Sequence, residues 1–203
     1  MEMNIFKSTT KLIKTLMLMA SLGLMTSNAF CSGNITGKID TSILKYKGDA
    51  VVYLLGVKGV IKPQQKSIDQ ANLTFVPKVT TIPVGSTVLF TNTDKIYHNI
   101  NSRSLARQLN VDMQDQQPKS VIFDKPGEVH LLCSVHPEMA AWVVVTKNQY
   151  AAVTEHDGKF TIPNVPAGTY EIAAWSEHLK QNIKQTVTVA DGKTASVDIK
   201  MDI

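Results

Sequence analysis

Hydrophobic and polar residues alternate in short runs from residue 34 almost to the end of the chain, as is typical of strands buried on one face. In the run 87–92, Val88 and Phe90 fall on one face and the residues between them on the other. In the run 141–146, Trp142 and Val144 share a face. The expected strands are 34–40, 50–55, 73–77, 79–82, 87–92, 97–100, 121–123, 128–133, 141–146, 160–162, 170–175, 184–189 and 196–201. The sequence therefore predicts an all-β fold.

Two stretches between these runs lack the strand period. The stretch after residue 57 contains Lys58, Gly59, Pro63 and two glutamines, and we interpret it as a junction between domains. The stretch from Asn101 to Ser120 is polar with no clean period, which predicts a long connection with one helical turn.

The first 29 residues have the pattern of an export signal. Lys7, Lys11 and Lys14 precede an apolar run from residue 16 to 25, which is too short to span a bilayer. Small residues then end at Ala29, so we expect a signal peptide over 1–29, cleavage after Ala29 and a periplasmic protein without a membrane span. An uncleaved anchor is the alternative. A lipoprotein at Cys31 is disfavoured because Phe30 occupies the position where a small residue is needed.

The charge balance excludes two classes of partner. Residues 1–29 contain three lysines and one glutamate, so their removal lowers the formal net charge from +4 to +2. Arg103 and Arg107 are the only arginines, and no basic run is interleaved with aromatic residues. This composition supports neither nucleic-acid binding nor binding to a membrane surface.

The strongest chemical signal is the stretch 132–139, in which Cys133, His136 and Met139 follow one another at three-residue steps. A loop with this spacing can curl around one metal ion from one side, and His98 lies upstream to supply the other side. A thiolate, two imidazoles and a weak thioether form the ligand set of a blue-copper electron-transfer site. Zinc is a weaker alternative because a thioether is a poor zinc ligand.

Strand parity and distance along the chain argue against the other histidines as ligands of the metal. Val129, Leu131 and Cys133 share one face of their strand, so His130 points to the opposite face. His156 and His178 lie far down the chain and are interpreted as surface residues. A disulfide between Cys31 and Cys133 would destroy the proposed site, so we expect Cys31 to be a free thiol or part of a ragged mature N-terminus.

The segments 75–77 and 83–88, the pair His98-Asn99 and the Cys133-x-x-His136-x-x-Met139 loop together resemble the plastocyanin/azurin cupredoxins. The loop, with Pro137 after the histidine, is most similar to that of amicyanin. The resemblance covers about residues 62–148 and implies a Greek-key β-sandwich with one copper ion at its rim.

Carried over by position, this resemblance implies a role for each residue of the site. His98 would be the buried imidazole, Cys133 the thiolate, His136 the imidazole near the surface and Met139 the axial thioether. Asn99 would tie the two ligand loops together by hydrogen bonds. Phe75, Val88, Phe90 and Trp142 are candidates for the apolar shell of the metal. Val135 stands where many relatives have proline before the second histidine, which affects the expected potential more than the binding.

The last part of the chain has turn signals at Asp157-Gly158 and at Pro166-Ala167-Gly168, separating short strands. This part resembles the carboxypeptidase regulatory-like, transthyretin-like β-sandwich, and the strands near Gly37 and at 50–55 resemble the start of the same module. We therefore predict a discontinuous second sandwich, formed by 33–60 and 149–203, that carries the cupredoxin as an insertion.

These observations predict a one-electron carrier that meets redox proteins transiently, such as cytochromes or a periplasmic dehydrogenase. The alternatives are a copper-binding or copper-delivery protein without a shuttle role, and a structural β module with a vestigial copper site. An enzyme is not expected, because no second copper ligand cluster, nucleophile elbow, phosphate loop or HExxH motif occurs in the sequence.

Overall fold

The computed structural model describes residues 32–114, 117–179 and 183–201. These residues form sixteen strands and one 3-10 turn, and none of them lies in an α-helix, which confirms the all-β prediction. The expected signal peptide (1–29) and Cys31 lie outside the described residues. The elements are β1 (Ser32–Asp40), η1 (Leu44–Tyr46), β2 (Val51–Leu55), β3 (Gln65–Ala71), β4 (Thr74–Val76), β5 (Val79–Pro83), β6 (Ser86–Asn92), β7 (Asn99–Arg103), β8 (Gln108–Asp112), β9 (Lys119–Phe123), β10 (Gly127–Leu132), β11 (Ala140–Thr146), β12 (Ala151–Val153), β13 (Lys159–Pro166), β14 (Gly168–Trp175), β15 (Ile183–Val189) and β16 (Thr194–Lys200).

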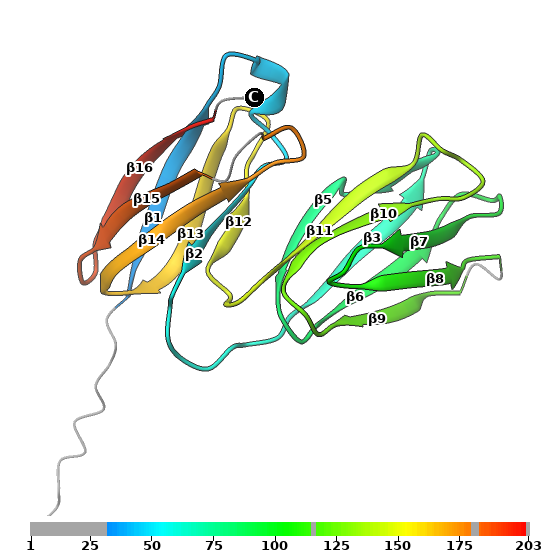
Figure 1. The fold of residues 1–203 in the computed structure, drawn as a ribbon, viewed down its shortest axis with the longest axis horizontal. Coiled ribbons are helices and arrows are strands. Elements are labelled where there is room, and N and C mark those ends of the chain that lie inside the picture. The colour runs from blue at the N-terminus through cyan, green and yellow to red at the C-terminus, as the bar shows by residue number, and fades with distance from the viewer. Residues whose placement is uncertain (1–31, 115–116, 180–182, 202–203) are drawn as a thin grey trace, which may run out of the picture.

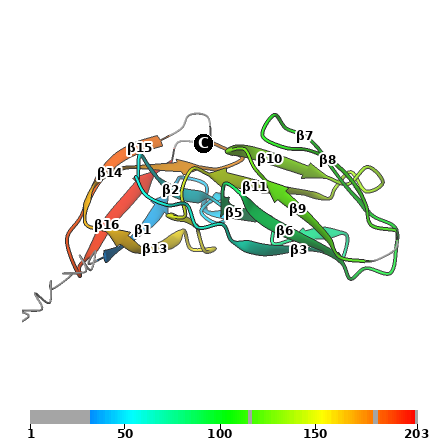
Figure 2. The same ribbon diagram turned by 90° about the horizontal axis from the view of Figure 1, so that it is seen from below.

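Strands β3 to β11 form one β-sandwich, which we call the central sandwich (Figure 1). One of its sheets has the strand order β4-β3-β6-β9 and the other the order β5-β11-β10-β7-β8. Seen from below, the two sheets form two layers, with β10, β7 and β8 above β3 and β6 (Figure 2). Among the described residues, no helix is long and apolar enough to cross a membrane.

The remaining strands form a second β-sandwich, which we call the terminal sandwich, from segments that lie at both ends of the described chain. Strand β1 lies between β13 and β16, and strand β2 lies between β12 and β14. The register of β1 pairs Gly37 with Phe160 on one side and with Val197 on the other. Strands before and after the central sandwich in sequence therefore belong to the same two sheets (Figure 1).

Each sandwich has its own apolar core. Residues Val88 and Phe90 are fully buried in the central core, as the alternation in β6 predicts, because this face of the strand points toward the opposite sheet. Phe75 is in the same core, which also contains Cys133 and Met139. The terminal core is separate and is built around residues such as Ile35, Leu54, Phe160 and Ile172.

Three expectations about the strands are wrong in detail. The predicted connection from Asn101 to Ser120 contains the edge strand β8 and no helical turn among its described residues. Only Leu109 and Val111 of β8 pack on the core, because an edge strand exposes its other face to water, so its apolar signal is weak. The junction after residue 57 is also shorter than predicted, because β3 begins at Gln65 and pairs in parallel with β6. Strand β12, which has only three residues, was not predicted.

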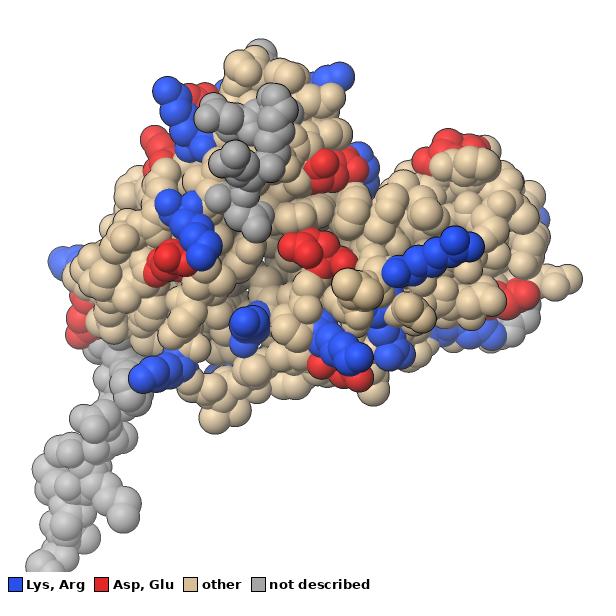
Figure 3. Space-filling model, viewed as in Figure 1, with Lys and Arg blue, Asp and Glu red and all other residues tan. Residues whose placement is uncertain are grey.

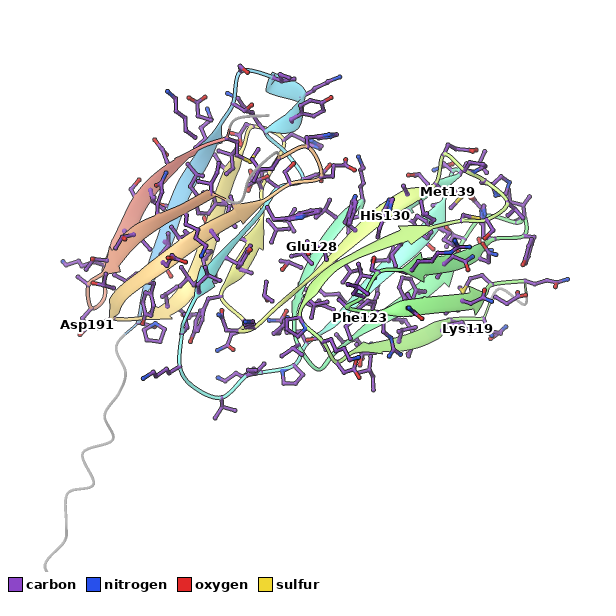
Figure 4. The ribbon with its side chains drawn as sticks, viewed as in Figure 1. Lys119, Phe123, Glu128, His130, Met139 and Asp191 are labelled. Carbon is purple, nitrogen blue, oxygen red and sulfur yellow. The ribbon has the colours of Figure 1, made fainter. Side chains whose placement is uncertain are left out.

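The two sandwiches are in contact through a third, smaller apolar cluster that includes Val79, Val144 and Trp175, with Trp142 and Tyr53 packed against it. The ring of Trp142 stacks on that of His130, with centroids 4.1 Å apart, and meets Trp175 edge to face at 5.2 Å. Figure 4 shows His130 and Glu128 on the side of the central sandwich that faces the terminal sandwich. Burial lowers the pKa of His130, which favours the neutral imidazole in this stack.

Glu177 is the polar centre of this contact. Its carboxylate accepts a hydrogen bond of 3.0 Å from the indole N–H of Trp142 and forms an ion pair with Lys78, both of which belong to the central sandwich. Burial raises the pKa of Glu177, but the bonds from Lys78 and Trp142 outweigh it and hold that pKa below its ordinary value. The ionised form is therefore the form that joins the two sandwiches.

We expect Glu177→Gln to lower the free energy of unfolding by about 0.5–1.5 kcal/mol at pH 7, because it removes a charge that is paired with Lys78 and bonded to Trp142 but is still partly screened by water. The folded pKa is lowered, so this stabilisation is present above the ordinary glutamate pKa and is lost as the pH falls through the folded value. The difference from wild type should therefore shrink between about pH 5 and pH 3 in denaturant titrations.

Glu171→Gln is the matched control, because Glu171 pairs with Lys184 at 2.9 Å while about half of its side chain is exposed. A pair of this kind contributes about 0.2–1 kcal/mol at most. Equal losses in the two variants would contradict the role given to Glu177.

Candidate metal centre

Two strand ends at the same edge of the central sandwich bring His98 and Cys133 together. His98 directly precedes β7, and Cys133 directly follows β10. These strands are antiparallel neighbours, with Leu132 opposite Asn101, so the residues beyond Leu132 run alongside the start of β7. Both His98 and Cys133 are buried, and the thiol of Cys133 is not in a disulfide.

Three ligand atoms converge at this edge. The Nδ1 atoms of His98 and His136 lie 3.0 Å apart, and the Sγ atom of Cys133 lies 3.9 Å from each of them. The centre of a triangle with these sides is about 2.1 Å from each corner, within the roughly 2.0–2.3 Å of metal bonds to imidazole and thiolate. The three side chains therefore fit a single ion.

The loop that carries Cys133, His136 and Met139 is closed by its own backbone. The amide of Met139 donates to the carbonyl of His136 at 2.9 Å, and the amide of Cys133 donates to the carbonyl of Met139 at 3.2 Å. Met139 is fully buried in the same core as Cys133, whereas His136 is half-exposed. The β10–β11 loop with Met139 lies away from the terminal sandwich (Figure 4).

Asp94 determines which nitrogen of His98 can bind a metal. Its Oδ2 atom lies 2.9 Å from Nε2 of His98, and its carboxylate also accepts the backbone N–H groups of Asn72 and Leu73 at 2.7 and 3.0 Å. The bond from Leu73 and the bond from His98 lower the pKa of Asp94. Because the carboxylate carries no proton, Nε2 of His98 is the donor, and Nδ1 keeps its lone pair for the ion.

The same carboxylate also fixes the turn between β3 and β4. Asn72 and Leu73 both have positive φ angles, 54° and 58°, a conformation that a leucine rarely adopts. Their N–H groups both point to Asp94, which compensates for the cost of this backbone. The turn and the imidazole are therefore held by one side chain.

Asn99 connects the two ligand segments. Its Oδ1 atom accepts the backbone N–H of Ser134 at 2.8 Å, and the side chain of Asn101 donates to the hydroxyl of Ser134 at 2.7 Å. Since Ser134 follows Cys133 and Asn99 follows His98, these bonds set the spacing of the thiol and the imidazole.

The structure thus brings His98, Cys133 and His136 together, with Met139 in the same loop as Cys133 and His136, and with Asn99 joining that loop to the segment of His98. It places His130 on the opposite face of its strand, against Trp142. Trp142, expected in the apolar shell of the metal, is not there: it belongs to the contact between the sandwiches. His156 is exposed and His178 is half-exposed in the terminal sandwich, as expected.

Asp94 is the functional residue that the sequence analysis missed. The sequence did contain a signal for this role, because Asp94 and His98 are only four residues apart in the segment between two strands. A carboxylate that precedes a metal-binding histidine at short range is a common partner for its second nitrogen.

Comparison with known families agrees with the geometry of this centre. Residues 63–147 match the family of copper binding proteins of the plastocyanin/azurin type. Residues 127–197 match domain II of polysaccharide lyase family 4, a match that begins in the central sandwich at β10 and continues through β15 and most of β16. It does not test the expected likeness to carboxypeptidase regulatory-like modules. No curated protein sequence matches the chain.

Several solved structures are similar in part. A purple cupredoxin from Nitrosopumilus maritimus is 26% identical with a TM-score of 0.36, and the match covers 40% of this chain and 99% of that one. A Cu(I) form of an amicyanin mutant is 22% identical with a TM-score of 0.37, covering 48% and 99%. A copper-containing nitrite reductase from Thermus scotoductus SA-01 is 24% identical with a TM-score of 0.37, covering 53% and 28%.

The copper assignment rests on the family match and on the converging ligand atoms. Residues 63–147 form a copper-binding domain of the plastocyanin/azurin type, and His98, Cys133, His136 and Met139 are positioned as a type 1 copper site. A thiolate and a thioether in one donor set favour copper over hard cations.

We expect Asp94→Asn to weaken copper binding about 10- to 100-fold, because an amide in place of the carboxylate no longer fixes the tautomer of His98. Competition with a chelator measures this change. Asp124→Asn is the control, since Asp124 is an exposed carboxylate that pairs with Arg107 at 3.8 Å. An unchanged affinity in Asp94→Asn would contradict the role of this carboxylate.

Proposed function

We propose that this protein is an exported type 1 copper protein that carries single electrons between redox partners. The observation that carries the proposal is the unequal burial of the ligands: His98, Cys133 and Met139 are buried, and His136 alone reaches the surface. A centre of this kind retains its metal while one ligand remains within reach of a partner.

Copper, when bound, supplies a one-electron cycle between Cu(I) and Cu(II). The chain contributes ligands that hydrogen bonds and packing already hold in place, through Asp94 on His98, Asn99 on the cysteine loop and the core around Met139. Little needs to rearrange when the charge changes, because these supports do not depend on the ion. The apolar residues Phe75, Val88 and Phe90 exclude water from the core below the site.

The surface around His136 supports an encounter with another protein. Val135 precedes His136 and is 45% exposed, and Ile96 and Tyr97, which precede His98, are 47% and 40% exposed. Leu132 beside Cys133 is also exposed. These exposed apolar side chains lie next to the two ligand segments in the sequence, and they are of the kind that transient redox encounters use.

Charge contributes little to this encounter. On the face shown in Figure 3, basic and acidic side chains are interspersed and neither sign gathers into a large patch. Glu138 adds one exposed negative charge to the loop of His136. We therefore propose partners such as a cytochrome or a periplasmic dehydrogenase, recognised by apolar contact with weak long-range steering.

The setting of the protein is also a proposal. The pattern of residues 1–29 supports export to the periplasm, with cleavage after Ala29. We propose that the terminal sandwich, residues 33–60 with 149–203, is a carboxypeptidase regulatory-like module that carries the copper domain of residues 62–148. The pairing of β1 and β2 with strands after residue 150 supports this division.

We expect the copper-loaded protein to show an intense visible band from the thiolate-to-Cu(II) transition, and Cys133→Ser to lose the band while keeping its far-UV circular dichroism. His156→Gln is the control and should keep the band, since His156 is exposed and far from the site in sequence. Absence of the band from the wild type would favour a vestigial site.

We expect reversible electron exchange with a small cytochrome at about 10⁵–10⁷ M⁻¹s⁻¹, faster than transfer of copper to a competing chelator. Val135→Asp should slow the exchange several-fold without altering the visible spectrum. Val60→Asp is the matched control, because Val60 is 83% exposed in the linker before β3. Copper transfer that outpaces electron exchange would support a delivery protein instead.

A further inference from the structure

Two amide side chains are buried in the central sandwich, at positions where strands of this kind normally carry apolar residues. Gln70 of β3 is fully buried, and Asn92 of β6 is 7% exposed. They are direct partners in the parallel pairing of β3 and β6. Their side chains therefore project from the same face of the sheet, in the row that continues Ile68 and Phe90 toward the copper end.

The nitrogen atoms of both amides already have partners. Nε2 of Gln70 donates to the carbonyl of Asn99 at 3.2 Å, and Nδ2 of Asn92 donates to the carbonyl of Ile96 at 3.0 Å. A carbonyl accepts only from a donor, so these bonds establish which atom of each amide is nitrogen and which is oxygen.

The oxygen atoms of the two amides have no such partner. Among the described residues, no group forms a hydrogen bond with Oε1 of Gln70 or with Oδ1 of Asn92. A buried polar atom left in this way has lost its hydrogen bonds to water without a replacement, which destabilises the folded state. Two of them on adjacent side chains would remove a large share of the small net stability of a domain.

We propose that one internal water molecule binds between Gln70 and Asn92, and that this pair with its water positions His98 in the copper site. A water molecule has two O–H donors and so satisfies both orphaned oxygens at once, as buried waters commonly do. A hard cation does not fit, because it needs about six or more oxygen ligands. The inference rests on the copper site and does not depend on the carrier role.

The pair holds the segment that carries His98 from both ends. The backbone carbonyl of Gln70 accepts the N–H groups of Thr93 and Asp94 at 3.0 and 3.1 Å. The side chain of Asn92 binds the carbonyl of Ile96, two residues before His98. Gln70 also binds the carbonyl of Asn99, directly after His98. The water completes this support by joining the two amides to each other.

A high-resolution crystal structure of the copper-loaded mature protein tests the water directly. We expect one fully occupied water within about 2.7–3.2 Å of both oxygens. A direct amide-to-amide bond with no water, or an ion with many oxygen ligands at this position, would overturn the proposal.

The variants Gln70→Leu and Asn92→Leu, with their double variant, test the positioning. Each single variant should leave one orphaned oxygen, so the losses in unfolding free energy should be non-additive and the double variant should lose less than the sum. Copper affinity should fall about tenfold in each single variant, and the hyperfine splitting of the Cu(II) electron paramagnetic resonance spectrum should change.

Asn148→Leu is the matched control. Asn148 is also a buried amide, 5% exposed, but its Nδ2 donates to the carbonyl of Leu54 and its Oδ1 accepts the N–H of Tyr150. It should lose stability without altering the copper spectrum or affinity. Additive losses at Gln70 and Asn92, with copper readouts as unchanged as those of Asn148→Leu, would overturn the positioning role.

Discussion

The hydrogen bond between Asp94 and His98 is the interaction on which the copper site depends. An imidazole can present either nitrogen to a metal, and only a fixed partner on one of them determines which one is free. Asp94 provides that partner while it also binds the turn between β3 and β4, so the geometry of the ligand and the fold of the neighbouring hairpin are one constraint. The converging positions of Cys133 and His136 have chemical meaning only because Nδ1 of His98 is the atom that faces them.

The terminal sandwich contributes a second constraint. Trp142 and His130 occupy the outer face of the sheet whose inner face holds Cys133, and they are covered by Trp175 and held by Glu177. This face would otherwise expose two aromatic rings to water. The outward residues of β10 and β11 therefore serve the contact between the sandwiches, while the inward residues of the same strands serve the metal.

Most of the site could be predicted from the sequence, because its residues lie in one short loop and strand parity is a local property. The spacing from Cys133 to Met139 and the exclusion of His130 needed no tertiary information. Trp142 could not be placed in this way, since parity gives its face but not what covers that face. Strand β8 was missed because its apolar side chains are few, and Gln70 and Asn92 were missed because a polar residue in a strand normally indicates the solvent side. Their burial follows from the pairing of β3 with β6, two strands that are separated in the sequence by β4 and β5.

The chain leaves the terminal sandwich after β2 and returns to it at β12, and these two strands are hydrogen-bonded neighbours, with Ala151 opposite Tyr53. In the topology of the terminal sandwich, the whole copper domain therefore occupies the position of one loop. The pairing of β2 with β12 holds the two ends of this loop next to each other. The entropy of closing such a loop rises only with the logarithm of its length, so a long insertion at this point costs little more than a short one. The host fold can accommodate a complete metalloprotein between two adjacent strands, and the same junction is a natural place to exchange one inserted domain for another.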